Sequence, residues 1–153
     1  MRKRTHLKVC CPGDGGGILS RDVQLRLDAV TVKDCAARSG DRQTIGLGGG
    51  ALIEGGSVVL NDMVLSENSA RVGGAAMLST NPIDGGVAEV VAYNSTLTRN
   101  AASLMGGAVY VDEGSSATFV RSVVRWNVAA SSGGAFALDG GAVLCGTRLF
   151  NDT

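Results

Sequence analysis

Apolar and polar positions recur along the chain in a nine-residue pattern that aligns five times without gaps. In each copy the first and sixth positions are apolar, the ninth is small and usually polar, and the positions between them vary. Successive copies end 33, 32, 27 and 25 residues apart, and a period of roughly 20–50 residues is typical of repeat architectures. We call one repeat a coil and each aligned position a column. The five copies are LDAVTVKDC (27–35), LNDMVLSEN (60–68), AYNSTLTRN (92–100), FVRSVVRWN (119–127) and LCGTRLFND (144–152).

Each coil contains three short strand-like runs separated by turn signals. The runs are rich in Val and Thr, and none has the length or the 3.6-residue period of a helix. Strands stacked in register in this way predict an all-β fold, a right-handed single-stranded parallel β-helix of the pectin-lyase-like kind with about five coils. We assign residues 15–153 to the β-helix and residues 1–14 to an N-terminal tail or incomplete cap. A Gly-Gly step follows four of the copies, at 49–50, 73–74, 106–107 and 133–134.

The columns predict which side chains point inward. Alternate strand residues face opposite sides, so the first column and the column two residues before it form the core, and neither contains a charge. The ninth column predicts a structural ladder of buried amides formed by Asn68, Asn100 and Asn127. Asn also tolerates left-handed backbone, so we place a sharp corner at this column. Replacing Asn100 with Ala is expected to cost about 1–3 kcal/mol.

Two tetrapeptides in each coil resemble a known repeat. The first type includes Gly-Gly-Ala-Val at 106–109 and Gly-Gly-Ala-Phe at 133–136, and the second includes Leu-Ser-Glu-Asn at 65–68 and Val-Arg-Trp-Asn at 124–127. They resemble the repeats of the polymorphic outer-membrane proteins, which are autotransporter passengers. The Phe that begins the second tetrapeptide in that family is Leu or Val here. The resemblance implies a secreted or cell-surface adhesin, although the chain shows no signal peptide and no membrane-anchoring barrel.

Composition excludes several classes of protein. The 14 basic and 14 acidic residues give zero net charge, which argues against nucleic-acid binding. No run of about 18 apolar residues predicts a membrane span. The single histidine, His6, and the four scattered cysteines predict no metal site, no cofactor and no disulfide framework. The last copy stops at Thr153 without a Gly-Gly step, so we favour an uncapped segment of a longer protein over end-to-end or side-by-side self-association.

The eighth column supplies the candidate catalytic residues. Asp34 and Glu67 would lie one strand spacing apart on adjacent coils, about 5 Å, which suits an acid–base pair or a calcium ion. The simpler interpretation is two solvated turn charges. No third acid joins the column, so we expect no enzyme. If the chain is one, it is a polysaccharide lyase or hydrolase fragment that acts on a polyuronate-like glycan.

The seventh and eighth columns also predict a ligand-binding patch. They place Arg99, Arg125, Trp126 and Phe150 on neighbouring coils. An outward Trp126 could stack on a sugar ring or a partner side chain, with the arginines as hydrogen-bond donors. The alternative is that Trp126 folds back over the corner and covers Asn127.

The function we favour from the sequence is a non-catalytic interaction or adhesion module that binds a glycan or a protein surface. A purely structural spacer of a longer repeat protein is the third alternative. Two inserts interrupt the repeat, Ser39–Leu47 and Ser79–Gly86, and loops of this kind often carry specificity.

Overall fold

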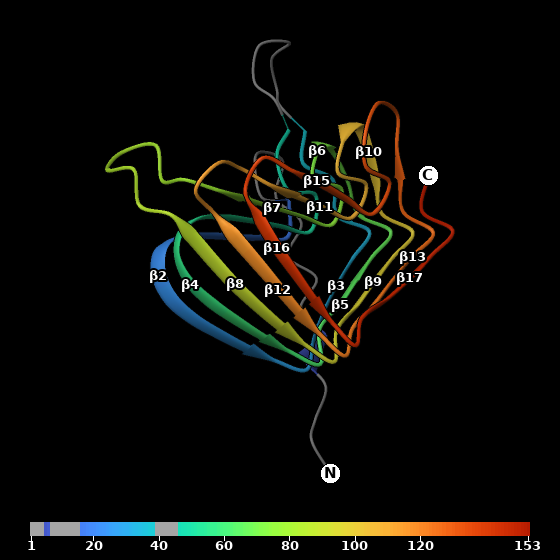
Figure 1. The fold of residues 1–153 in the computed structure, drawn as a ribbon, viewed down its shortest axis with the longest axis horizontal. Helices are drawn as coiled ribbons and strands as arrows, with labels where there is room; N and C mark the ends of the chain where they lie inside the picture. Colours follow the sequence, from blue (N-terminus) through green and yellow to red (C-terminus); the bar gives the residue numbers. More distant parts are fainter. Residues whose placement is uncertain (1–4, 7–15, 39–45) are drawn as a thin grey trace.

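The computed structural model describes residues 5–6, 16–38 and 46–153, and within these ranges the protein is all-β without a helix. Every pair of neighbouring strands is parallel, and most strands pair with the strand at the same place in the next repeat. Figure 1 shows the resulting stack of turns, which run from blue at one end to red at the other. The predicted tail, 1–14, and the insert at Ser39–Leu47 lie largely outside the described residues.

The strands form three sheets. The 11-residue strand β4 spans two sides of a coil, because β7 pairs with its first half and β8 with its second. The first sheet contains β1 (Thr5–His6), β3 (Val30–Lys33), β5 (Val64–Ser66), β9 (Thr96–Thr98), β13 (Val123–Arg125) and β17 (Arg148–Phe150). The second contains β6 (Ser69–Val72), β10 (Ala101–Met105) and β14 (Val128–Ala129). The third contains β2 (Ile18–Asp28), β4 (Ala51–Asn61), β7 (Ala76–Ser79), β8 (Ala88–Tyr93), β11 (Val109–Val111), β12 (Ser116–Val120), β15 (Phe136–Leu138) and β16 (Gly141–Cys145).

The strand register reproduces the columns of the sequence alignment. Leu60 pairs with Ala92, Ala92 with Phe119, and Phe119 with Leu144. The predicted inward columns are buried in the middle coils, which confirms that part of the core prediction. Leu144 and Leu149 are 43% and 45% exposed, because no described strand stacks on the outer edges of β16 and β17. The buried members of the two predicted columns are Val58, Leu60, Val90, Ala92, Ala117 and Phe119, and the apolar sixth column, which was not assigned to the core, is also buried at Val32, Leu65, Leu97 and Val124.

A second apolar cluster covers the opposite side of the third sheet. Leu52, Met77 and Tyr110 pair in register and pack against Val72 from the second sheet. The Tyr110 hydroxyl donates a hydrogen bond to the Asp139 carboxylate. Burial, followed by this hydrogen bond and the negative charge of Asp139, raises the pKa of Tyr110 above its usual range.

Alkaline pH should destabilise the protein through Tyr110. Its pKa is higher in the folded than in the unfolded chain, so its contribution is complete below the unfolded pKa, about 10. That contribution is lost as the pH rises toward the folded value. We expect the free energy of unfolding to fall more steeply above pH 10 in the parent chain than in Tyr110→Phe. Urea unfolding at several pH values measures both slopes, and equal slopes would contradict the assignment.

The backbone makes two left-handed turns within each nine-residue copy. The third-column residue has positive φ in all five copies, and so does the eighth-column residue. The prediction that the ninth-column Asn takes the left-handed conformation is therefore wrong by one residue. The residue before the Asn turns the chain, and this turn lets the Asn side chain point inward. The third column contains Ala29, Asp62, Asn94, Arg121 and Gly146, and the eighth contains Asp34, Glu67, Arg99, Trp126 and Asn151.

The ninth-column side chains form a continuous hydrogen-bonded row. The Oδ1 atom of Asn100 accepts from the backbone N–H and from Nδ2 of Asn68, both at 3.0 Å. Asn127 accepts in the same way from Asn100, at 3.0 and 2.9 Å, and Asp152 accepts from Asn127, at 2.8 and 2.9 Å. The three Asn side chains are at most 1% exposed. Each of these ninth-column side chains therefore accepts hydrogen bonds from the preceding coil, so the row has one direction along the stack.

A second row of polar side chains follows the third-column corner, and the sequence analysis missed it. The Ser95 hydroxyl accepts from the backbone N–H of Met63 at 3.3 Å, and the Ser122 hydroxyl accepts from that of Ser95 at 3.1 Å. Thr147 continues the row by accepting from Ser122 at 3.4 Å. Both corners thus use an inward polar side chain to bind the backbone of the neighbouring coil.

Cysteine pairing differs from the sequence-based expectation. Cys35 is disulfide-bonded, whereas Cys145 is an exposed free thiol. The spacing of the cysteines did not predict this bond. Among the described residues, no helix is long and apolar enough to cross a membrane.

Candidate functional site

The eighth column presents a line of exposed side chains along one corner of the stack. Each of its residues directly follows a strand of the first sheet and has a positive φ, which turns the side chain away from the core. In Figure 1 this corner follows β3, β5, β9, β13 and β17 on the right of the molecule. All five side chains are exposed. The corner therefore brings together both sets of residues that the sequence singled out.

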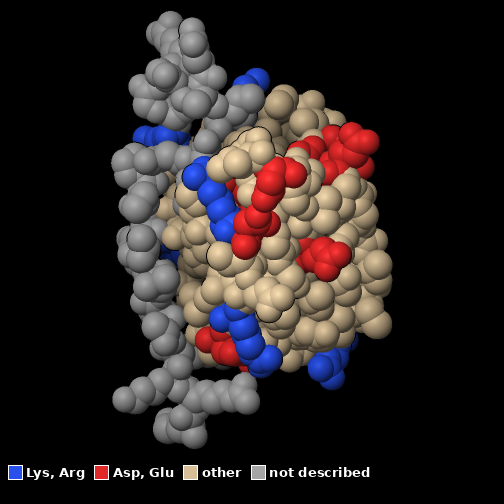
Figure 2. Space-filling view, turned by 90° about the vertical axis from the view of Figure 1, so that its left-hand side faces the viewer, with Lys and Arg blue, Asp and Glu red and all other residues tan. Residues whose placement is uncertain are grey.

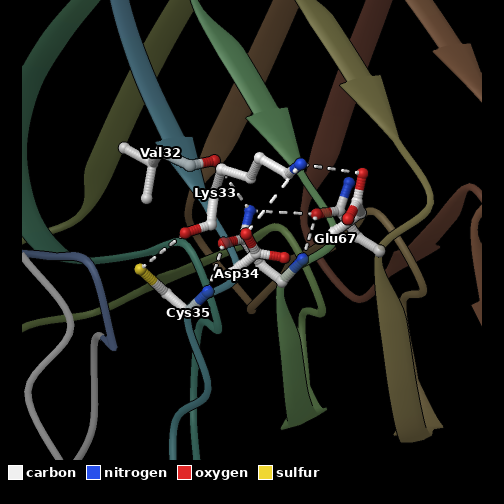
Figure 3. Close-up of polar contacts among 7 residues, drawn as sticks. Val32, Lys33, Asp34, Cys35 and Glu67 are labelled. Atoms are coloured by element: carbon white, nitrogen blue, oxygen red, sulfur yellow. Dashed lines mark hydrogen bonds and ion pairs between the residues drawn. The ribbon is translucent and has the colours of Figure 1, made fainter. Parts of the chain in front are cut away.

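The candidate catalytic pair lies on the first two coils and shares one cation. The Lys33 ammonium is 3.4 Å from Glu67 Oε1 and 3.9 Å from Asp34 Oδ2 (Figure 3). The side chains of Lys33, Asp34 and Glu67 are 49%, 49% and 39% exposed. Exposed ion pairs of this kind contribute little to stability. In the described part of the chain, no three His, Cys, Asp or Glu residues are arranged to hold a metal ion.

The candidate binding residues lie on the later coils and contact one another. The guanidinium carbon of Arg125 is 4.5 Å from the centroid of the Trp126 ring, and that of Arg99 is 5.1 Å from it. Both distances are within the range of cation–π attraction. Trp126 is 39% exposed, so its ring remains accessible beside the two arginines. We call Arg99, Arg125 and Trp126 the arginine–tryptophan cluster.

The two arginines of this cluster have no acidic partner among the described residues. The ion pairs found there are Arg21–Glu54, Arg26–Asp28 and the two contacts of Lys33. Figure 2 shows another face of the molecule, on which blue and red side chains lie side by side. In contrast, β9, β13, β17 and the corner residue after each contain three arginines and no acid. Among the described residues, no ion pair compensates the positive charge on this side of the later coils, and the acid that follows β17, Asp152, accepts hydrogen bonds from Asn127 instead.

Two polar atoms beside the cluster are buried without a hydrogen-bond partner. They are Nε of Arg125 and Oγ1 of Thr98, residues that pair in register between β13 and β9. Thr98 is only 9% exposed. Sequence reasoning did not single out Thr98, although it precedes Arg125 in the seventh column. Unpaired buried donors are uncommon in folded proteins, so this pair marks the site as polar and unsatisfied.

Phe150 extends the candidate site to the last coil. It pairs in register with Arg125 and is 48% exposed. It also lines a hollow at the end of the stack together with Phe136 and Leu149. The structure therefore places all four predicted binding residues on adjacent coils, and it brings three of them into direct contact.

The insert at Ser79–Gly86 forms a turn that exposes an apolar side chain. Ile83 is 87% exposed, and its backbone N–H is bound by Asn81 Oδ1 at 2.9 Å. The carboxyl groups of Asp22 and Asp84 share a hydrogen bond, which, with the charge of Asp84, raises the pKa of Asp22. This contact joins the loop to β2 and lies on a different side of the coil from the arginine–tryptophan cluster.

Comparisons with known proteins give no assignment. No protein-family model matches the chain, no curated protein is similar to it, and no solved structure matches its fold. A functional assignment therefore has to come from the geometry of the chain itself.

Proposed function

We propose that the chain is a non-catalytic interaction module of a secreted or surface protein, folded as a right-handed single-stranded parallel β-helix. The in-register parallel pairing of successive repeats supports the fold. The Gly-Gly and Asn tetrapeptides support a relationship to the polymorphic outer-membrane protein repeats and hence an adhesin role. The ligand in this proposal is a glycan or a protein surface.

The arginine–tryptophan cluster is the observation that carries this proposal. It combines an exposed aromatic ring with two guanidinium groups on a corner fixed by stacked backbone. Aromatic and arginine side chains are enriched in binding hot spots, because they offer large contact areas and several hydrogen-bond donors. Sites on a rigid sheet bind with little ordering cost.

Trp126→Ala is expected to reduce ligand binding about tenfold or more while leaving the fold intact. The indole lies on the surface, so its loss should change the unfolding midpoint little. Co-sedimentation with a panel of neutral and acidic polysaccharides measures binding, and thermal unfolding measures stability. Tyr93→Ala is the matched control, because Tyr93 is a partly exposed aromatic residue on β8, away from this corner. Equal losses of ligand binding in Trp126→Ala and Tyr93→Ala would contradict the proposal.

A glycan-cleaving enzyme is the second candidate, and the adjacency of Asp34 and Glu67 on successive coils favours it. New reducing ends or unsaturated products would appear when the chain is incubated with a polyuronate. Glu67→Gln should then abolish product formation while binding persists. Absence of both polysaccharide binding and cleavage would instead favour a protein partner or the role of a structural spacer.

A further inference from the structure

We propose that the arginine–tryptophan cluster recognises the anionic group, a carboxylate or a sulfate ester, of an acidic polysaccharide. This inference rests on the proposed binding function and specifies the chemistry of its ligand. It follows from two guanidinium groups, one indole and one buried hydroxyl on neighbouring strands, where no described residue supplies an acidic partner.

Uncompensated charge is the first argument. Arg99 and Arg125 both lie near the Trp126 ring, so one exposed aromatic side chain has two guanidinium groups beside it. Neither has an ion-pair partner among the described residues. Two guanidinium groups beside one ring and without a counter-charge attract an anion, because the anion interacts favourably with both.

Preorganisation is the second argument. The indole restrains the two long side chains and reduces the rotamer entropy that binding would otherwise cost. A guanidinium group offers a planar fork of N–H donors that matches the paired oxygens of a carboxylate or sulfate. Two such forks on adjacent coils can bind one anionic group from two sides.

Unsatisfied donors are the third argument. The Arg125 Nε–H group and the Thr98 hydroxyl have no acceptor in the part of the chain that the structure describes. Arg125 and Thr98 pair in register between β13 and β9, so the two unpaired groups lie on adjacent strands next to the Trp126 ring. An anion that enters here supplies the acceptors that both groups lack.

Backbone pairing favours a polysaccharide over an acidic peptide. Peptides commonly bind by adding a strand to a free sheet edge. At the arginine–tryptophan cluster β13 is paired on both sides, with β9 and with β17, so a ligand seated on the cluster meets no free edge of β13, and the free edge of this sheet lies one strand further, on β17. Recognition by the cluster itself therefore uses side chains, and Trp126 and Phe150 offer exposed rings for contact with the apolar faces of sugar rings.

Three polymers with one backbone test the inference: dextran, carboxymethyl-dextran and dextran sulfate. We expect the full chain to bind one or both anionic polymers at least about tenfold more tightly than dextran, with an affinity that falls as salt rises. Arg99→Gln and Arg125→Gln should each weaken this binding about tenfold. Arg121→Gln is the matched control, because it removes the same charge from the third-column corner that precedes β13. Its effect should be less than about twofold.

Each other outcome overturns a stated part of the proposal. Equal binding of dextran and its anionic derivatives, lost in Trp126→Ala, would overturn the anion site but leave the binding function standing. Equal losses of affinity in Arg121→Gln and Arg125→Gln would overturn the anion site and indicate non-specific charge attraction. If poly-glutamate binds as tightly as the anionic dextrans, the assignment of the ligand as a polysaccharide is overturned, and an acidic protein partner is indicated. No binding to any polymer would overturn both the anion site and the glycan-binding function.

Discussion

Gly107→Ala is expected to lower the free energy of unfolding by about 4 kcal/mol or more. A Cβ atom at this position would lie 2.3 Å from the carbonyl oxygen of Gly134 and 2.6 Å from the carbonyl carbon of Val128. Both contacts are with backbone, which cannot rotate away as a side chain can. Relief would require the Gly-Gly corners of two coils to separate, and this separation would stretch the strand pairing on either side. Urea unfolding followed by circular dichroism measures the loss.

Gly141→Ala is the control for this prediction. A Cβ atom there meets nothing within 4 Å, and the residue is not among those with positive φ. Alanine should therefore leave stability unchanged or raise it by about 0.4–1 kcal/mol, because it restricts the unfolded chain. If Gly107→Ala unfolds at the same urea concentration as Gly141→Ala, close contact between the Gly-Gly corners does not hold the coils together.

Asn100→Ala is expected to cost about 3–4 kcal/mol, more than the sequence alone suggested. The sequence estimate counted one buried amide, whereas the structure gives this side chain four hydrogen bonds. Its Oδ1 accepts twice from Asn68, and its Nδ2 donates to Leu65 at 3.0 Å and to Asn127 at 2.9 Å. Alanine would leave several buried groups unpaired, at about 1–3 kcal/mol for each group that finds no other partner. Equilibrium unfolding measures the difference.

Two variants separate the amide row from a general effect of losing an Asn. Asn61→Ala removes an Asn on the surface, whose hydrogen bond to Asp28 is exposed, and it should cost less than about 0.5 kcal/mol. Asn100→Asp keeps the size of the side chain but replaces the Nδ2 donor with an acceptor that faces the Leu65 carbonyl. It should cost at least as much as Asn100→Ala at neutral pH. A cost for Asn100→Ala no larger than that of Asn61→Ala would show that the row adds no stability.

The repeat made the core columns and the amide row predictable, because stacking places equivalent residues in contact. The exact corner was not predictable from residue type. Glu67, Arg99 and Trp126 rarely adopt positive φ, yet all three do so here. The inward turn of the Asn that follows, with its hydrogen bonds to the adjacent coil, overrides the local preference. A corner fixed by neighbouring coils leaves its own residue free to vary, which explains the variety of the eighth column.

The candidate site was predictable in position but not in detail. The alignment placed Trp126 beside Arg99 and Arg125, yet their ring contacts depend on rotamers that no column specifies. Thr98 could not be found because its significance lies in a missing hydrogen bond. The hydroxyl row through Ser95 escaped notice because Val30 and Met63 occupy the same column in the first two coils.

The one-way orientation of the amide row gives the stack a polarity of its own. Every side-chain carbonyl from Asn68 to Asn127 points toward the earlier coil, so the amide dipoles add head to tail along the axis. Asp152 places an acidic group at the end where the N–H groups point, and hydrogen bonds in such a chain polarise one another. Side chains of the amide row that are not in contact with each other are thereby coupled through the polarised hydrogen bonds between them. The free-energy costs of changing Asn68 and Asn127 together should therefore differ from the sum of the single changes, although one whole coil separates them.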